Sequence, residues 1–138
     1  MKLSLVVVIL LICGSARAQA RLEIVVKNVK EAKGSVRVGI FKDSKTFLKE
    51  AIYGQVVKAS KGDVKVIFES VPAGTYAISV IHDENENGEL DSGMFGIPKE
   101  GFGFANDAMG TFGPPSFEKA SIIIGNDPEI ISIGMKYL

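Results

Sequence analysis

Residues 72–82 read PAGTYAISVIH, and this stretch is the clearest indication of the fold. The proline and the glycine at its start form a turn signal, because proline presets one backbone angle and glycine tolerates unusual ones. After the turn, Tyr76, Ile78 and Val80 alternate with other residues. A period of two places every second side chain on one face of a sheet. The stretch therefore predicts a turn followed by a half-buried β-strand.

The same pattern recurs on both sides of this stretch. Alternating or continuous runs of strand-forming residues, separated by turn signals, occupy residues 22–26, 36–40, 53–59, 64–68, 120–124 and 131–137. Short strands joined by turns are typical of an antiparallel sandwich, in which two sheets bury their apolar faces against each other. Long helices do not alternate with these strands, which argues against a parallel α/β sheet.

One short helix is predicted at residues 44–51. Asp43 or Ser44 can accept hydrogen bonds from the free N–H groups at its start. Phe47 and Leu48 would then face the core. The sequence therefore predicts an all-β fold, an antiparallel β-sandwich of about seven strands with one short helix.

The N-terminus has the pattern of a secretory signal peptide. Lys2 precedes a mostly apolar run over residues 3–13, and an A-x-A cleavage pattern ends at Ala18. We therefore expect a signal peptide over residues 1–18, cleaved after Ala18, and a single periplasmic or extracellular domain over residues 19–138. The run is short for a hydrocarbon core of ~30 Å, so we expect no transmembrane span after processing.

Two other interpretations of this segment are a retained membrane anchor and a lipoprotein signal. Cys13 follows Ile12, where a lipobox would carry a small residue, so we place Cys13 in the discarded segment. It is the only cysteine. The mature chain is therefore predicted to have no disulfide, no thiol catalysis and no thiolate metal site.

The loop after the PAGTYAISVIH strand is the strongest candidate for a binding site. Residues 83–91 read DENENGELD, with five acidic and no basic side chains. The pattern D-x-N-x-N-G matches the start of a calcium-binding loop, in which alternate oxygens converge and glycine permits the sharp bend. Hard oxygen ligands suit Ca²⁺. The predicted Ca²⁺ ligands are Asp83, Asn85, Asn87, Glu89 through its backbone carbonyl, and Asp91.

The loop departs from an EF-hand in one important respect. Its position 12 is Met94, where an EF-hand has a bidentate glutamate, and no helices flank the loop. Water, Glu100 or Asp107 would have to complete the coordination, with a weak dissociation constant of about 10⁻⁴ to 10⁻³ M. The alternative is a polar hairpin without metal, in which Asn87 and Gly88 make a tight turn.

The next segment, residues 91–117, is rich in glycine and contains five of the eight phenylalanines. Long segments without regular structure are uncommon in compact domains and are often functional. Its aromatic side chains could form the binding surface for a small apolar ligand. Alternatively, they pack inward and close one end of the sandwich.

The sequence offers little for catalysis. His82 is the only histidine, and no nucleophile motif accompanies it, so a satisfied histidine at a strand end is the favoured interpretation. One histidine without cysteine argues against catalytic zinc. The acidic pairs share one solvated turn, which would not separate their pKa values as glycosidases require. The sequence contains no cluster of basic residues of the kind that binds nucleic acid.

Three stretches carry a resemblance to a known family: residues 71–91, 96–106 and 113–117. They resemble the signature of the bacterial domain of unknown function 2141, over about residues 21–138. That resemblance implies an exported protein with no assigned activity. The P-x-G-x-Y-x-x-x-V pattern is also similar to prealbumin-like and carboxypeptidase-regulatory-like β-sandwiches, a likeness of fold that transfers no functional residues.

Together these features predict an exported, non-enzymatic binding or structural module, with Ca²⁺ ordering its acidic loop. Its partner would be a protein, a glycan or a small apolar ligand. The alternative is a carrier for a small apolar ligand held under the Phe/Gly-rich segment, and a hydrolase is the third interpretation.

Overall fold

The computed structural model describes residue 14 and residues 18–138. The predicted signal peptide over residues 1–18 therefore lies almost wholly outside the described residues. Within the described part of the chain, no helix has the length and apolar character needed to cross a membrane.

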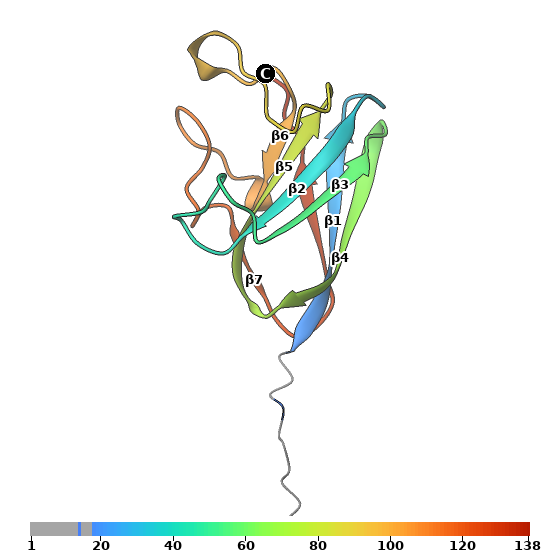
Figure 1. Cartoon of the computed structure of the whole chain (residues 1–138), viewed down its shortest axis with the longest axis vertical. Helices are drawn as coiled ribbons and strands as arrows, with labels where there is room; N and C mark the ends of the chain where they lie inside the picture. The colour runs from blue at the N-terminus through green and yellow to red at the C-terminus, as the bar shows by residue number, and fades with distance from the viewer. Residues whose placement is uncertain (1–13, 15–17) are drawn as a thin grey trace, which may run out of the picture.

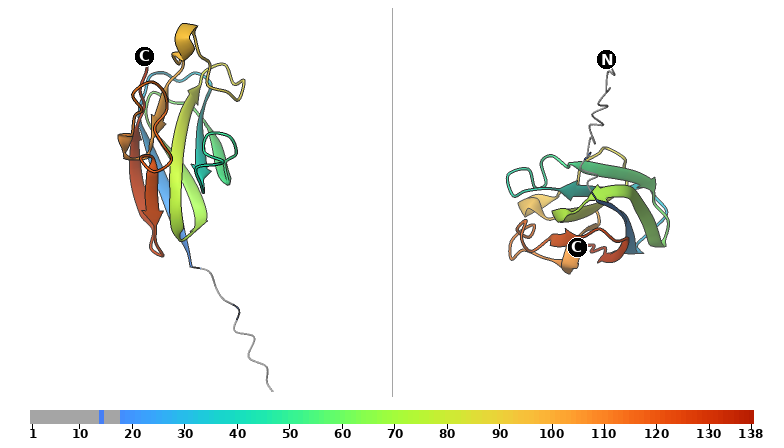
Figure 2. Two further views of the ribbon diagram at one scale, coloured as in Figure 1. Left: turned by 90° about the vertical axis from the view of Figure 1, so that its left-hand side faces the viewer. Right: turned by 90° about the horizontal axis from the view of Figure 1, so that it is seen from below.

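The described residues form two packed sheets (Figures 1 and 2). The strands are β1 (Gln19–Val29), β2 (Ser35–Phe41), β3 (Tyr53–Lys58), β4 (Gly62–Pro72), β5 (Gly74–Asp83), β6 (Phe102–Phe104), β7 (Ser121–Ile124) and β8 (Glu129–Gly134). One sheet has the order β4-β1-β8. The other has the order β3-β2-β5-β6, and β7 also pairs with β5. The predicted β-sandwich is confirmed, with eight strands where about seven were expected.

One strand pair departs from the antiparallel prediction. All the other neighbouring strands pair antiparallel, but β8 pairs parallel with β1, from Leu22 opposite Glu129 to Lys27 opposite Gly134. A hairpin forces its two strands to run antiparallel. No hairpin joins β1 to β8, because β8 enters this sheet from β7 in the opposite sheet.

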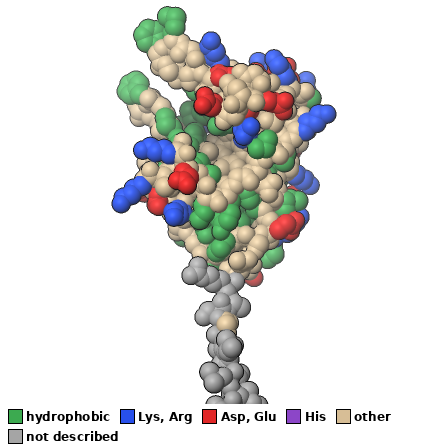
Figure 3. All heavy atoms as spheres, viewed as in Figure 1, with side chains coloured by type: hydrophobic (Ala, Val, Ile, Leu, Met, Phe, Trp, Pro, Cys, Tyr) green, Lys and Arg blue, Asp and Glu red, His purple; other side chains and the backbone are tan. Residues whose placement is uncertain are grey.

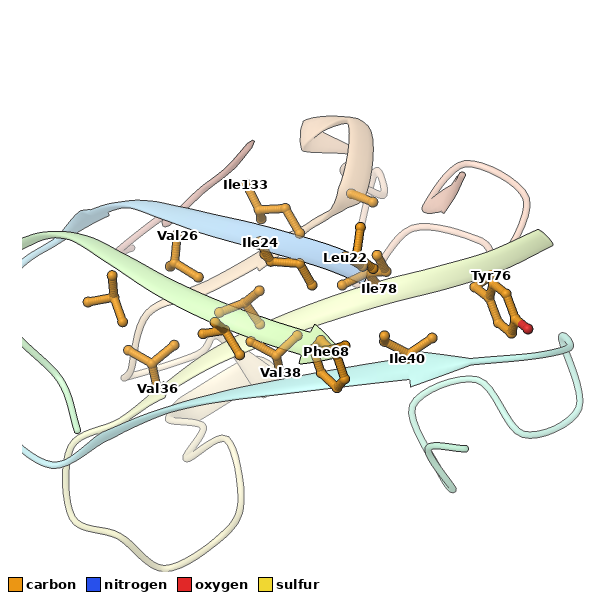
Figure 4. Close-up of a cluster of buried hydrophobic side chains, with 14 of the residues drawn as sticks. Leu22, Ile24, Val26, Val36, Val38, Ile40, Phe68, Tyr76, Ile78 and Ile133 are labelled. Atoms are coloured by element: carbon orange, nitrogen blue, oxygen red, sulfur yellow. The ribbon is translucent and has the colours of Figure 1, made fainter. Parts of the chain in front are cut away.

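The core lies between the sheets and is built from the alternating residues. Leu22, Ile24 and Val26 on β1 are at most 1% exposed. They face apolar side chains of the other sheet (Figure 4): Val36, Val38, Ile40, Tyr76 and Ile78. Burying apolar area of this kind is the dominant favourable term in folding.

A second apolar cluster covers part of the outer face of the five-stranded sheet. It contains Phe41, Phe102 and Phe104, with Phe47 and Phe117 packed against them. The ring of Phe47 makes edge-to-face contacts with Phe41, Phe104 and Phe117 at centroid distances of 5.4, 6.3 and 6.0 Å. Residues far apart in sequence thus close one side of this face.

The helix predicted at residues 44–51 is wrong, since the segment forms hydrogen-bonded turns. Asp43 does accept a hydrogen bond from the Thr46 N–H at 2.9 Å, as predicted for a cap. However, Leu48 has a φ of 61°, a left-handed conformation that interrupts a right-handed helix. As a result, Phe47 packs inward as expected, whereas Leu48 is 42% exposed.

Candidate functional site

The acidic loop leaves β5 at Asp83, which is fully buried beneath it. Both oxygens of the Asp83 carboxylate hold the loop backbone. Oδ2 accepts a hydrogen bond from the Gly88 N–H at 2.8 Å, and Oδ1 accepts one from the Asn87 N–H at 3.2 Å. Gly88 has a φ of 82°, which glycine adopts without strain. The chain therefore turns back sharply over the Asp83 carboxylate.

Three predicted ligands converge above this turn. The amides of Asn85 and Asn87 both donate to the Asp91 carboxylate, the latter at 2.6 Å. The side-chain oxygen of Asn87 accepts from the Glu89 N–H at 2.9 Å, while the Glu89 side chain is exposed. The hydrogen bond from Asn87, reinforced by the one from Asn85, lowers the pKa of Asp91 below its ordinary value of 3.8. The loop is thus closed around Asp91.

Glu100 lies outside the loop in sequence, but its side chain holds both ends of the loop backbone. Its carboxylate is buried and accepts hydrogen bonds from the Glu84 N–H at 2.6 Å and the Asp91 N–H at 3.0 Å. Glu100 thus ties together the two ends of the loop, although its oxygens are already occupied by backbone donors. Asp107, the other suggested extra ligand, lies on η2 (Ala105–Asp107) and accepts from the Gly134 N–H at 3.0 Å instead.

Arg37 adds a positive charge at the base of the loop, which the sequence pattern did not indicate. Its Nε donates to Oδ2 of Asp83 at 2.8 Å. Its guanidinium lies under Gly88, since a Cβ added there would be 3.7 Å from a terminal nitrogen. Asp83 is therefore already paired with one cation, and this weakens its attraction for a second.

The donor set of this loop is rich in amides. Among the described residues, no group of three or more His, Cys, Asp or Glu side chains is placed to hold a metal ion. A cation here would depend on Asp91, the amide oxygens of Asn85 and Asn87, and backbone carbonyls. Both amides now present nitrogen to Asp91, and a half-turn of each presents oxygen instead. Such a set fits Ca²⁺ with weak affinity.

His82 is a structural residue in a buried hydrogen-bond chain. The Tyr137 hydroxyl accepts from the Lys30 N–H at 2.9 Å and lies 2.8 Å from Nδ1 of His82. Burial raises the pKa of Tyr137 above 10.0, so the hydroxyl keeps its proton and can donate it to Nδ1. Nε2 of His82 then donates to the Lys33 carbonyl at 2.7 Å. Both ring nitrogens are satisfied, as expected for a histidine at a strand end.

The phenylalanines of residues 91–117 divide into two groups. Phe102, Phe104 and Phe117 belong to the cluster on the outer sheet face. Phe95 and Phe112 are 93% and 102% exposed, and apolar side chains stand at two projecting loops in Figure 3. The packing interpretation therefore holds for three of the five, and two are left in solvent.

Two surface depressions lie on or beside the five-stranded sheet. One, of about 120 Å³, is lined by Lys42, Thr46, Glu50, Ala51 and Ile52. The other, of about 240 Å³, lies over β2, β3 and β5. Neither is lined by the Phe/Gly-rich segment. Phe102, Phe104 and Phe117 of that segment pack in the outer cluster of the sheet.

Residues 24–132 match the model of a family described as an uncharacterized protein conserved in bacteria, DUF2141. The chain belongs to this family. The match includes the acidic loop and the Phe/Gly-rich segment, so the predicted resemblance is confirmed. No curated protein and no solved structure matches the chain.

Proposed function

We propose that this DUF2141 protein is an exported, non-enzymatic β-sandwich module that binds a partner, and that Ca²⁺ orders its acidic loop. The convergence of Asn85, Asn87 and Asp91 carries the proposal. Asp83 and Glu100 hold the loop backbone from below, so that these side chains meet without further folding. Binding to a preorganised loop avoids part of the entropy cost of ordering it.

Electrostatics favours a cation in this loop. Residues 83–91 carry five acidic side chains, of which Asp83 alone has an ion-pair partner among the described residues. Like charges this close repel one another, and a divalent cation would reduce that repulsion. Asp91, Asn85, Asn87 and the Glu89 carbonyl would supply oxygens, and water would complete the shell.

The same cation would position an exposed apolar arm. Residues 91–100 form this arm, which is closed at its base by a hydrogen bond from the Lys99 N–H to the Asp91 carbonyl at 2.7 Å. Its tip is η1 (Met94–Gly96), where Met94 and Phe95 are 79% and 93% exposed. Because Asp91 is both a ligand and the start of the arm, ordering Asp91 would order the arm. The exposed tip supports a role in binding a protein, a glycan or a small apolar ligand.

Export is supported by the signal-peptide pattern and by the position of the first strand. β1 begins at Gln19, the residue after the predicted cleavage site. Cleavage there would leave intact all eight strands that the structure describes.

Calorimetric titration of the mature chain with Ca²⁺ tests the metal site. We expect binding with a dissociation constant of about 10⁻⁴ to 10⁻³ M and a rise in melting temperature at saturating Ca²⁺. Asp91→Asn should weaken binding, whereas Asp127→Asn should leave it unchanged, because Asp127 is exposed between β7 and β8, and β7 pairs with the end of β5 opposite Asp83. The absence of both heat and thermal stabilisation at several millimolar Ca²⁺ would end the metal proposal.

A further inference from the structure

The larger depression lies on the outer face of the five-stranded sheet, where β2, β3 and β5 lie side by side (Figure 1). Its floor is a row of small residues across the strands, because Gly39 pairs with both Gly54 and Ser79. On one side stands the next row, in which Arg37 pairs with Val56 and Ile81. On the other side the depression is bounded by Phe41 and Ala51.

Glycine at position 54 is not required by the backbone. Its φ lies outside the left-handed region, and a Cβ built there would meet only the Val38 carbonyl, at 3.8 Å. Glycine weakens a strand and often marks a place where a ligand or another chain comes close. The missing side chain at Gly54 therefore preserves the open floor of the depression. Gly39 differs, because a Cβ there would lie 3.0 Å from the Phe41 ring.

Two polar side chains of the depression have unused hydrogen-bonding capacity. Ser79 is 8% exposed, and within residues 18–138 its hydroxyl has no hydrogen-bond partner. Arg37 uses Nε for Asp83, but its two terminal nitrogens make no hydrogen bond to the described residues. Its side chain is 35% exposed. The Ser79 hydroxyl opens onto the depression, so a ligand oxygen can accept its hydrogen bond in place of water.

We propose that this depression binds a small carboxylate-bearing molecule with an apolar body. The planar guanidinium of Arg37 presents paired N–H donors that match a carboxylate, and Ser79 adds a hydroxyl donor. The apolar body would lie over Gly54, between Val56 and the Phe41 ring that covers Gly39. A volume of about 240 Å³ is below the ~300 Å³ of pockets for drug-sized ligands, so the ligand is short. This site borders the acidic loop through Gly88 and Arg37, but it uses none of the proposed Ca²⁺ ligands.

Octanoate is the probe. Its binding is measured by ¹⁵N NMR of the mature chain, with and without added Ca²⁺. We expect saturable shifts concentrated on β2, β3 and β5 in both conditions, with weaker binding of octanol and octylammonium. Gly54→Val should weaken octanoate binding by at least about tenfold without lowering the melting temperature, because its side chain enters the depression. Gly125→Val is the matched control, since a Cβ there meets nothing within 4 Å. It should leave affinity unchanged.

Ser79→Ala and Arg37→Lys separate the two polar contacts, and each should weaken octanoate more than octanol. Three results would overturn the proposal: no octanoate binding at millimolar concentrations, equal affinity for octanol, or binding that Gly54→Val does not weaken. Shifts centred on Phe95 and Phe112 would also overturn it, because they would place the ligand at the loop tips. A failure of the calcium titration would leave the octanoate result unaffected, so the two proposals fail separately.

Discussion

Replacing Tyr137 with phenylalanine removes one oxygen atom that joins two parts of the structure. That hydroxyl accepts from the Lys30 N–H at 2.9 Å and lies 2.8 Å from Nδ1 of His82. Lys30 is exposed, so its N–H can turn to water at little cost. His82 is fully buried, and its Nδ1 would lose its partner. An unsatisfied buried acceptor costs about 1–3 kcal/mol. We therefore expect Tyr137→Phe to lower the free energy of unfolding by this amount.

Urea unfolding of the mature chain measures this loss, and thermal unfolding should show a fall in melting temperature of roughly 4–12 °C. Tyr53→Phe is the matched control, because Tyr53 is also half-buried but its hydroxyl has no hydrogen-bond partner among residues 18–138. It should change stability by no more than about 0.5 kcal/mol. If Tyr137→Phe and Tyr53→Phe behave alike, the hydrogen-bond chain through His82 does not stabilise the fold as argued.

Three further predictions concern the acidic loop and the phenylalanines. The hydrogen bond from Asn87 depresses the pKa of Asp91, so its stabilising contribution is present above pH 3.8 and is lost as the pH falls through the lower folded value. Asp91→Asn should therefore flatten the acid part of a stability profile measured by urea unfolding, and an unchanged profile would contradict this. Phe104→Ala should cost about 3–5 kcal/mol, because the ring is buried in the outer cluster. Phe95→Ser and Phe112→Ser should each change stability by no more than about 0.5 kcal/mol, and a larger loss would show that these rings are packed.

The strands were predictable because their signal is local. Leu22, Ile24 and Val26 alternate in the sequence and are all buried on one face of β1. A strand places successive side chains on opposite faces wherever it sits in the fold. The helix at residues 44–51 failed for the opposite reason. Its apolar spacing was compatible with a helix, but packing of Phe47 into the outer cluster and the left-handed angle at Leu48 produce turns.

The acidic loop was predictable in part. The spacing of Asn85, Asn87 and Asp91 indicated convergence, and the structure brings their side chains together. The ion pair of Asp83 with Arg37 spans 46 positions in sequence, and no local pattern signals such a contact. Glu100 was named as a possible metal ligand, yet its contacts with the Glu84 and Asp91 N–H groups make it a clasp for the loop.

By itself, the sequence determined that this chain forms short, amphipathic strands and an oxygen-rich turn, because both depend on spacings of a few residues. The tertiary structure alone decided that β8 joins β1 in parallel, that Phe95 and Phe112 stay in solvent, and that Gly54, Gly39 and Ser79 align across three strands. These outcomes depend on which strands become neighbours and in which register. Register is set by pairing across the sheet, between residues that are distant along the chain.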